Sequence, residues 1–332
     1  MRLSLLNAFI AVAEAGGVRP AARKLGISQP ALSKTVQLLE QDLGVALFVR
    51  GARGVTLSEA GKAFLPRARA LSAEERRARD ELAQLRGATD GCLSIGVAPS
   101  AAMGLAPRAI VALRKRWPKA VLRVIDVLYP TVLSMLREGE IDIALGPRIG
   151  PRPEPGSNIL MQPLLLNQVC IVVRRDHPLA HATTLAELAD AEWLRSGPKG
   201  GPSTVIEEAF KAAGLDPPRA LVQCESFLAL PDIVANSELV AIAPSQLLEQ
   251  HAARANVVQV HVRESLQPTE VSLLTRAGEP LAPIARDMVE IVRSLVANGA
   301  VNGASADTRT AAVTYTHGAA ARETTAARRK PA

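Results

Sequence analysis

The sequence predicts an α + α/β fold: a helical N-terminal domain, one long helix, and a two-lobed α/β body. Three observations carry this prediction. Apolar residues recur at helical spacing, broken by glycines, as far as Leu43; a single long helical pattern follows; and from Cys92 short apolar strands alternate with helices. The 332 residues, 48% hydrophobic and 21% charged, supply apolar cores for two or three units and exclude wholesale disorder.

Three short helices are predicted at the N-terminus. The first begins at Leu3, and the second spans Val18–Leu25, each ended by a glycine. Ser28 carries the hydroxyl of a helix N-cap, and Pro30 occupies the first turn, where its missing N–H costs nothing. A third helix therefore runs from there to Leu43. A helix, a glycine turn and a capped helix together make a helix-turn-helix.

A two-stranded wing is predicted after the third helix. Strand-forming residues at 46–50 and 55–57 flank a glycine-rich tip at Gly51–Gly54. Arg50 and Arg53 place positive charge at this tip. The N-terminal domain is therefore predicted to be a winged helix-turn-helix.

A long linker helix is predicted to begin after Ser58, a second N-cap hydroxyl, and to run to about Leu85. Its apolar residues keep heptad spacing: Phe64, Ala68, Leu71, Ala78, Leu82 and Leu85. Pro66 conflicts with this pattern, because an interior proline removes a backbone hydrogen bond and favours a kink. Since a solitary helix has nothing local against which to bury such a seam, we expect it to pair with its copy in a second subunit.

The remainder of the chain has the pattern of two α/β lobes. In the first lobe, strands are expected at 93–97, 121–127 and 141–145, with helices ending near Trp117 and Glu138. Gly146–Gly156 holds four prolines and three glycines, and is expected to be an exposed loop. In the second lobe, strands are expected near 170–173, 221–224 and 239–242, with helices from Ser203 and Pro244.

The last strand, at 271–274, and a helix over 282–296 are expected to return to the first lobe. The predicted divisions are a winged helix-turn-helix DNA-binding domain at 1–57, a linker helix and hinge at 58–90, a two-lobed domain at about 91–298, and a disordered tail at 299–332. Within the two-lobed domain, the first lobe is expected at about 91–163 and 268–298, and the second at about 164–267. The tail is assigned by composition, since it lacks periodicity and large apolar residues.

Positive charge is concentrated at the ends of the chain. Residues 1–87 hold 14 Lys/Arg against 8 Asp/Glu, whereas residues 88–299 hold 20 against 22. A basic N-terminal segment joined to a near-neutral body is typical of a nucleic-acid reader attached to another function. A basic surface that serves only solubility is the alternative.

Several function classes are disfavoured by what the sequence contains. Cys92, Cys170 and Cys224 lie far apart and are interpreted as core residues of a cytoplasmic protein, with a redox-sensing pair as the alternative. The scattered histidines and the missing catalytic fingerprints predict no metal, no cofactor and no enzymatic activity. No membrane span is predicted either, and a two-lobed solute-binding protein is disfavoured because no signal peptide is recognised.

The stretch Ala21–Ser33 resembles the LysR-type transcriptional regulators. Further similar pieces are Leu39-Glu40, Leu43-Gly44, Leu47–Arg50, Leu57–Gly61, Gly91–Gly96, Gly139–Ala144 and His177–Leu179, so the resemblance covers about residues 1–298. It implies a periplasmic-binding-protein-like effector domain, homodimers paired into homotetramers, an interrupted palindrome in promoter DNA, and effector-controlled engagement of RNA polymerase. The sequence departs from the family at Gly17-Val18, where a serine usually precedes Phe or Ile, and at Pro20.

Residues at the start of a recognition helix face base edges in the major groove. The candidate base readers are Ser28, Gln29, Pro30, Ser33, Lys34 and Gln37, and the candidate phosphate contacts are Arg23, Lys24, Arg50 and Arg53. Gln29 is the main candidate for direct readout, because its amide can make two hydrogen bonds to adenine. Lys34 is expected to meet phosphate. An ordinary solvated surface is the alternative for each of these residues.

A small organic anion is the predicted effector. Ser100, with the N–H groups of Ala101 and Ala102, is expected to form an anion site at a helix start. Ser203 and Thr204 begin a second helix in the same way, and the resemblance implies that the two starts face each other across a cleft. Neighbouring candidates are Tyr129, Thr131, Pro147, Arg148 and Phe227. Ordinary N-capping by Ser100 and Ser203 is the alternative.

Overall fold

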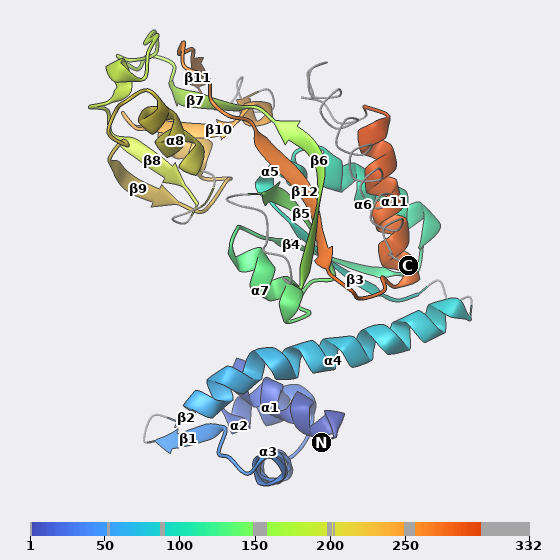
Figure 1. Ribbon diagram of the computed structural model, residues 1–332. Helices are drawn as coiled ribbons and strands as arrows, with labels where there is room; N and C mark the ends of the chain where they lie inside the picture. The colour runs from blue at the N-terminus through green and yellow to red at the C-terminus, as the bar shows by residue number, and fades with distance from the viewer. Residues whose placement is uncertain are drawn as a thin grey trace, which may run out of the picture.

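The computed structural model describes residues 2–51, 54–86, 90–148, 158–197, 201, 203–248 and 256–299 (Figure 1). A small helical domain with a β-hairpin is followed by one long helix and then by two five-stranded sheets. The predicted α + α/β fold is therefore confirmed. Arg53, residues 149–157 and the tail from residue 300 lie outside the described residues, so the predictions made for them keep that status.

The N-terminal domain contains the predicted helix-turn-helix and wing. Its elements are α1 (Leu3–Ala15), α2 (Val18–Leu25), α3 (Gln29–Leu43), β1 (Phe48–Gly51) and β2 (Gly54–Leu57). Gly16 and Gly26 end the first two helices with φ of 65° and 66°, a left-handed conformation that glycine adopts without a Cβ clash. The Ser28 hydroxyl accepts the Ala31 N–H at 3.3 Å, which confirms the predicted N-cap.

Helix α4 (Glu59–Leu85) is continuous through Pro66, and the Ser58 hydroxyl caps it by accepting the Gly61 N–H at 3.0 Å. The prediction that nothing local covers its apolar seam is wrong for the first half. Ala68 is fully buried, because it packs with Phe64 against α1 and the start of the wing. Further along the seam, Leu71 and Leu82 remain 46% and 56% exposed.

The first α/β sheet has the strand order β4-β3-β5-β12-β6. Its strands are β3 (Cys92–Val97), β4 (Val121–Asp126), β5 (Ile143–Arg148), β6 (Ile159–Asn167) and β12 (Thr269–Arg276). Its helices are α5 (Pro99–Ala102), α6 (Leu105–Arg116), α7 (Thr131–Arg137) and α11 (Pro283–Ala297). Helix α11 packs on α6, so the C-terminal part of the described chain returns to this sheet, as expected.

Two features of this sheet differ from the prediction. Residues 146–148 belong to β5 and not to a loop, because β12 pairs with them in antiparallel register. Strand β6 was not predicted, since Pro163 interrupts its apolar run. The proline is accommodated because β6 is an edge strand and its register with β12 shifts beside Pro163, between Val271 and Ser272.

The second sheet has the order β11-β7-β10-β8-β9. Its strands are β7 (Val169–Arg174), β8 (Trp193–Ser196), β9 (Ala220–Cys224), β10 (Val240–Pro244) and β11 (Val257–Val260). Its helices are α8 (Thr204–Ala212), α9 (Leu230–Ala235) and a 3-10 turn, Ala186–Leu188, while residues 245–248 are also helical. Of these strands, β8 and β11 were not predicted. The chain crosses between the sheets after β6 and again before β12.

Candidate nucleic-acid interface and effector site

Helix α3 separates a buried apolar face from an exposed polar face. Leu32, Val36 and Leu39 are at most 6% exposed and pack inside the N-terminal domain. Polar side chains and Pro30 occupy the other face at helical spacing: Gln29, Pro30, Lys34 and Gln37 are exposed, and Ser33 is half-buried. The structure thus brings together five of the six candidate base readers. The sixth, Ser28, lies at the N-cap, with its hydroxyl engaged by Ala31.

The candidate phosphate contacts lie on elements that flank this helix. Arg23 and Lys24 are exposed in the last turn of α2, and the Lys24 ammonium lies 3.5 Å from the Glu14 carboxylate. Because both partners of this ion pair are solvated, the pair leaves Lys24 free to exchange Glu14 for another anion at little cost. Arg50 lies in the hairpin opposite Val55.

The predicted anion site at Ser100 has a different geometry. Helix α5 is a single turn whose N-cap is Ala98 and not Ser100. The N–H groups of Ala101 and Ala102 already donate to the Ala98 carbonyl at 2.9 and 3.0 Å. The predicted pair of backbone donors is therefore wrong, because those groups are used by the turn itself. The Ser100 hydroxyl is buried and has no hydrogen-bond partner among the described residues.

Ser203 also differs from the prediction. It is the N-cap residue of α8, but its side chain caps no N–H of that helix. Its hydroxyl instead donates to the Ser196 carbonyl at 3.1 Å and accepts the Ser196 N–H at 2.8 Å, and it is 5% exposed. Similarly, the Thr204 hydroxyl donates to the Gly201 carbonyl at 2.9 Å. Each hydroxyl thus donates its one hydrogen within the protein, and neither is left to donate to an anion as predicted.

The other effector candidates are distributed over three places. Tyr129 and Thr131 lie at the start of α7, with Tyr129 half-buried and Thr131 exposed. Pro147 and Arg148 end β5, and Phe227 lies in the turn before α9. Ser100 and Ser203 line two separate hollows, and none of these five residues is among the described residues that line either one.

A polar cluster at the junction of the two lobes was missed by the sequence analysis. The Asn167 amide donates to the Ser100 carbonyl at 3.1 Å and accepts the Gln246 amide at 3.0 Å, and both amides are at most 5% exposed. The Gln246 Oε1 atom is buried without a hydrogen-bond partner among the described residues. A hollow lies here, lined by Ser100, Met103, Gly104, Leu105, Leu165, Asn167, Gln246 and Val271. The available signal was Asn167, a polar residue between two apolar strands.

Cys170 and Cys224 are buried as predicted, whereas Cys92 is exposed, so its assignment to the core is wrong. The positions of Cys170 and Cys224 oppose a redox switch between them. Their strands, β7 and β9, are separated by β10 and β8, so their backbones lie about 14 Å apart at the usual strand spacing, too far for a disulfide. Burial also raises the pKa of the Cys170 thiol to about 12, which keeps it protonated and unreactive. The described residues contain no group of three potential metal-ligating side chains. No helix among them is both long and apolar enough to cross a membrane.

The N-terminal domain is a winged helix-turn-helix with an exposed polar helix, and a long helix joins it to a two-lobed α/β domain. This architecture defines a DNA-binding regulator with a separate ligand-binding domain. Residues 3–62 match the family described as bacterial regulatory helix-turn-helix protein, lysR family, and residues 86–297 match the LysR substrate binding domain. The chain belongs to the LysR family of transcriptional regulators.

Known relatives cover nearly all of the described chain. The uncharacterized HTH-type transcriptional regulator YdcI of Escherichia coli (strain K12) is 29% identical over 295 residues, 88% of this chain and 95% of that protein. GbpR of Azospirillum brasilense is 29% identical over 299 residues, 89% of this chain and 86% of that protein. The crystal structure of CbnR, a LysR family regulator, has a TM-score of 0.66 at 26% identity, covering 89% of this chain and 99% of CbnR. CbnR has also been solved in complex with its target DNA.

Proposed function

We propose that this regulator acts in the cytoplasm, reads an interrupted palindrome in promoter DNA through α3, and responds to a small organic acid bound between its lobes. The exposed polar face of α3 carries the proposal. In this assignment Gln29 contacts a base edge, Pro30, Ser33 and Gln37 line the major groove, and Lys34, Arg23, Lys24, Arg50 and Arg53 contact phosphate. The divisions at 1–57, 58–90 and 91–298 are the proposed functional units.

Replacing Gln29 by alanine should reduce discrimination at one or two base pairs by about 1–3 kcal/mol, because two hydrogen bonds to a base are lost. Fluorescence anisotropy with specific and random duplexes measures this difference. Gln41→Ala is the matched control, since Gln41 is exposed on the same helix but at its far end. Arg50→Ala should instead weaken all duplexes alike and lower the salt slope. Equal losses on specific and random DNA for Gln29→Ala would reject the assignment.

The proposed effector site is the lobe junction, where the hollow has room for about one water molecule, so a bound acid requires the two lobes to move apart there. Two observations support it: Ser100 comes from the first lobe and Gln246 from the second, and each has a buried polar atom without a partner among the described residues. A buried polar group without a partner is unfavourable, so a ligand that satisfies both would stabilise one arrangement of the lobes. The Ser100 hydroxyl suits a carboxylate oxygen, and the Gln246 oxygen suits a donor such as a hydroxyl.

A thermal-shift screen of the full chain against aliphatic, aromatic and sulfonated acids, each with and without a hydroxyl, tests this site. A bound acid at a hundred times its Kd should add about 2.7 kcal/mol, which is a shift of a few degrees. Ser100→Ala should abolish most of the shift, whereas Ser294→Ala, an exposed serine on α11, should keep it. Shifts that survive Ser100→Ala would place the effector elsewhere. Ser203→Ala is uninformative here, because it unpairs the Ser196 backbone.

Self-association through α4 is the proposed assembly. The exposed Leu71 and Leu82 form the part of the apolar seam that the N-terminal domain leaves uncovered. Pairing of two such helices would bury these side chains and present two copies of α3 to the two halves of a palindrome. Homotetramers and contact with RNA polymerase are what the family implies beyond this dimer.

A further inference from the structure

One face of α4 lies along the first lobe (Figure 1). The Arg69 guanidinium lies 2.9 Å from the Glu138 carboxylate and 3.1 Å from that of Glu140, in the turn between α7 and β5. Fifteen residues along the helix, the buried Gln84 accepts the Ile284 N–H of α11 at 3.2 Å. The contact therefore extends over most of the second half of α4.

A glycine allows the helix to approach this closely. A Cβ placed on Gly139 would lie 2.3 Å from the Ala73 Cβ, far inside van der Waals contact. Ala73 and Arg77 lie four and eight residues after Arg69, so these positions share one face of the helix. The turn before β5 is thus shaped to receive α4.

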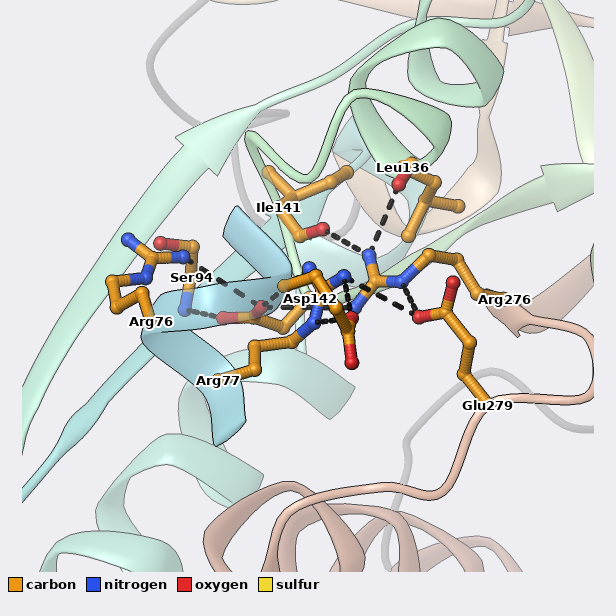
Figure 2. Close-up of polar contacts among 9 residues, drawn as sticks. Arg76, Arg77, Ser94, Leu136, Ile141, Asp142, Arg276 and Glu279 are labelled. Atoms are coloured by element: carbon orange, nitrogen blue, oxygen red, sulfur yellow. Dashed lines mark hydrogen bonds and ion pairs between the residues drawn. The ribbon is translucent and has the colours of Figure 1, made fainter. Parts of the chain in front are cut away.

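A buried carboxylate lies at the centre of the contact (Figure 2). Asp142 is 6% exposed, and its Oδ2 atom accepts the Ser94 N–H at 2.8 Å. Its Oδ1 atom lies 3.8 Å from the Arg276 guanidinium, 3.9 Å from that of Arg76 and 4.0 Å from that of Arg77. Two of these cations belong to α4 and one to the first lobe. The carboxylate therefore attracts the helix electrostatically at a site with little solvent screening.

Arg276 fixes the lobe side of the cluster. Its guanidinium donates to the Leu136 carbonyl at 3.0 Å and the Ile141 carbonyl at 2.9 Å, and it pairs with Glu279 at 2.6 Å. Glu279 also lies 3.4 Å from the Arg77 guanidinium. Arg77 thus meets two carboxylates of the lobe, held in place by one buried arginine (Figure 2).

Two paired strands connect this cluster to the lobe junction. Asp142 directly precedes β5, and Arg276 ends β12; the strands pair from Ala144 with Leu274 to Arg148 with Glu270. The other end of β12 begins opposite Asn167 of the polar junction cluster. The paired strands therefore form a continuous hydrogen-bonded path from the junction to Asp142 and Arg276.

The helix is tied equally well to the DNA-binding domain. The Ser72 hydroxyl donates to the Asn7 side chain of α1 at 2.7 Å, and Ala68 is fully buried against that domain. The Arg69 guanidinium also lies 3.7 Å from Glu14 of α1. A change in the angle of α4 on the lobe would therefore carry the N-terminal domain with it.

We propose that Asp142 and Arg77 are positioning residues that set the angle of α4 on the first lobe and so couple the lobe junction to the DNA-bound domain. The inference rests on the proposed function, because it supplies the link between effector site and DNA. It assigns the regulatory contact to charges within one chain, and not to the effector pocket itself.

The test is made on the full chain with Arg77→Glu. Arg79→Glu is the matched control, since it makes the same charge change on the same helix at a site 77% exposed that pairs only with Glu75 among the described residues. Hydrogen exchange of residues 69–85 and 136–142 reports docking of the helix, and a circular-permutation gel shift reports the DNA bend. Arg77→Glu should increase exchange in both segments and shift the bend angle. Arg77→Lys, which keeps the charge, should restore both.

The outcomes test two statements separately: that the cluster docks α4 on the first lobe, and that this docking is coupled to DNA. Wild-type exchange in Arg77→Glu, or the same change in Arg79→Glu, would overturn the role of the cluster in docking α4. Increased exchange with an unchanged bend would overturn the coupling to DNA. A wild-type chain that binds no palindromic DNA would overturn the proposed function, while exchange still decides the docking. Ala73→Leu offers an uncharged second variant, because a larger side chain opposite Gly139 should push the helix off the lobe.

Discussion

Replacing Gly61 by alanine should abolish DNA binding and destabilise the N-terminal domain by about 2 kcal/mol or more. A Cβ at this position would lie 2.1 Å from the Leu47 carbonyl oxygen. That oxygen cannot retreat easily, because it accepts the Ser58 N–H at 2.9 Å and Leu47 is fully buried. The strain falls where α4 leaves the wing. It therefore affects both the core of the N-terminal domain and the attachment of α4 to that domain.

Thermal melting and anisotropy on specific DNA measure the two effects of Gly61→Ala. Lys62→Ala is the control, because the neighbouring side chain is exposed and its loss removes only a solvated ion pair with Glu59. Wild-type melting and DNA affinity in Gly61→Ala would mean that α4 does not pack on the wing as described here.

Replacing Arg276 by alanine should destabilise the first lobe by about 3–5 kcal/mol, the usual loss when one member of a buried ion pair is removed. Arg276 is 8% exposed and satisfies the Leu136 and Ile141 carbonyls. Its removal takes a donor from each carbonyl, although the Leu136 carbonyl keeps the Gly139 N–H at 3.1 Å, and it reduces the positive charge around Asp142. Adding Asp142→Asn should therefore lower the free energy of unfolding by less in the Arg276→Ala variant than in the wild type.

The midpoint of urea unfolding, followed by a probe in the first lobe, measures the loss in Arg276→Ala. Arg286→Ala is the control, since Arg286 is exposed on α11. A midpoint within experimental scatter of the wild type would show that the cluster around Asp142 contributes little to the stability of the lobe.

Local signals made the N-terminal domain predictable from the sequence. Gly16, Gly26 and the Ser28 cap act on their own helices, so the bounds of α2 and α3 follow from neighbouring residues. Strands β6, β8 and β11 were missed because their pairing partners are distant in sequence. Pro163 in β6 even argues against a strand until its edge position is known.

The candidate effector site was predicted less well. A serine before a helix has the same local pattern whether it caps that helix or, like Ser203, binds the backbone of another strand. Ser100 is predicted to form an anion site at a helix start, whereas the structure places it inside a single turn beside the distant Gln246. The charge cluster at Asp142 had no local signal either, since Arg77 and Arg276 are far from it in sequence.

Selection of bound sequences from random double-stranded DNA tests the central claim most directly, namely that the full chain reads a promoter palindrome through α3. The wild-type chain should enrich two inverted half-sites separated by one helical turn or more, and Gln29→Ala should lose preference at one or two positions within each half-site. Enrichment of no sequence at near-physiological salt, or an unchanged motif in Gln29→Ala and in variants of Ser33 and Gln37, would contradict the account.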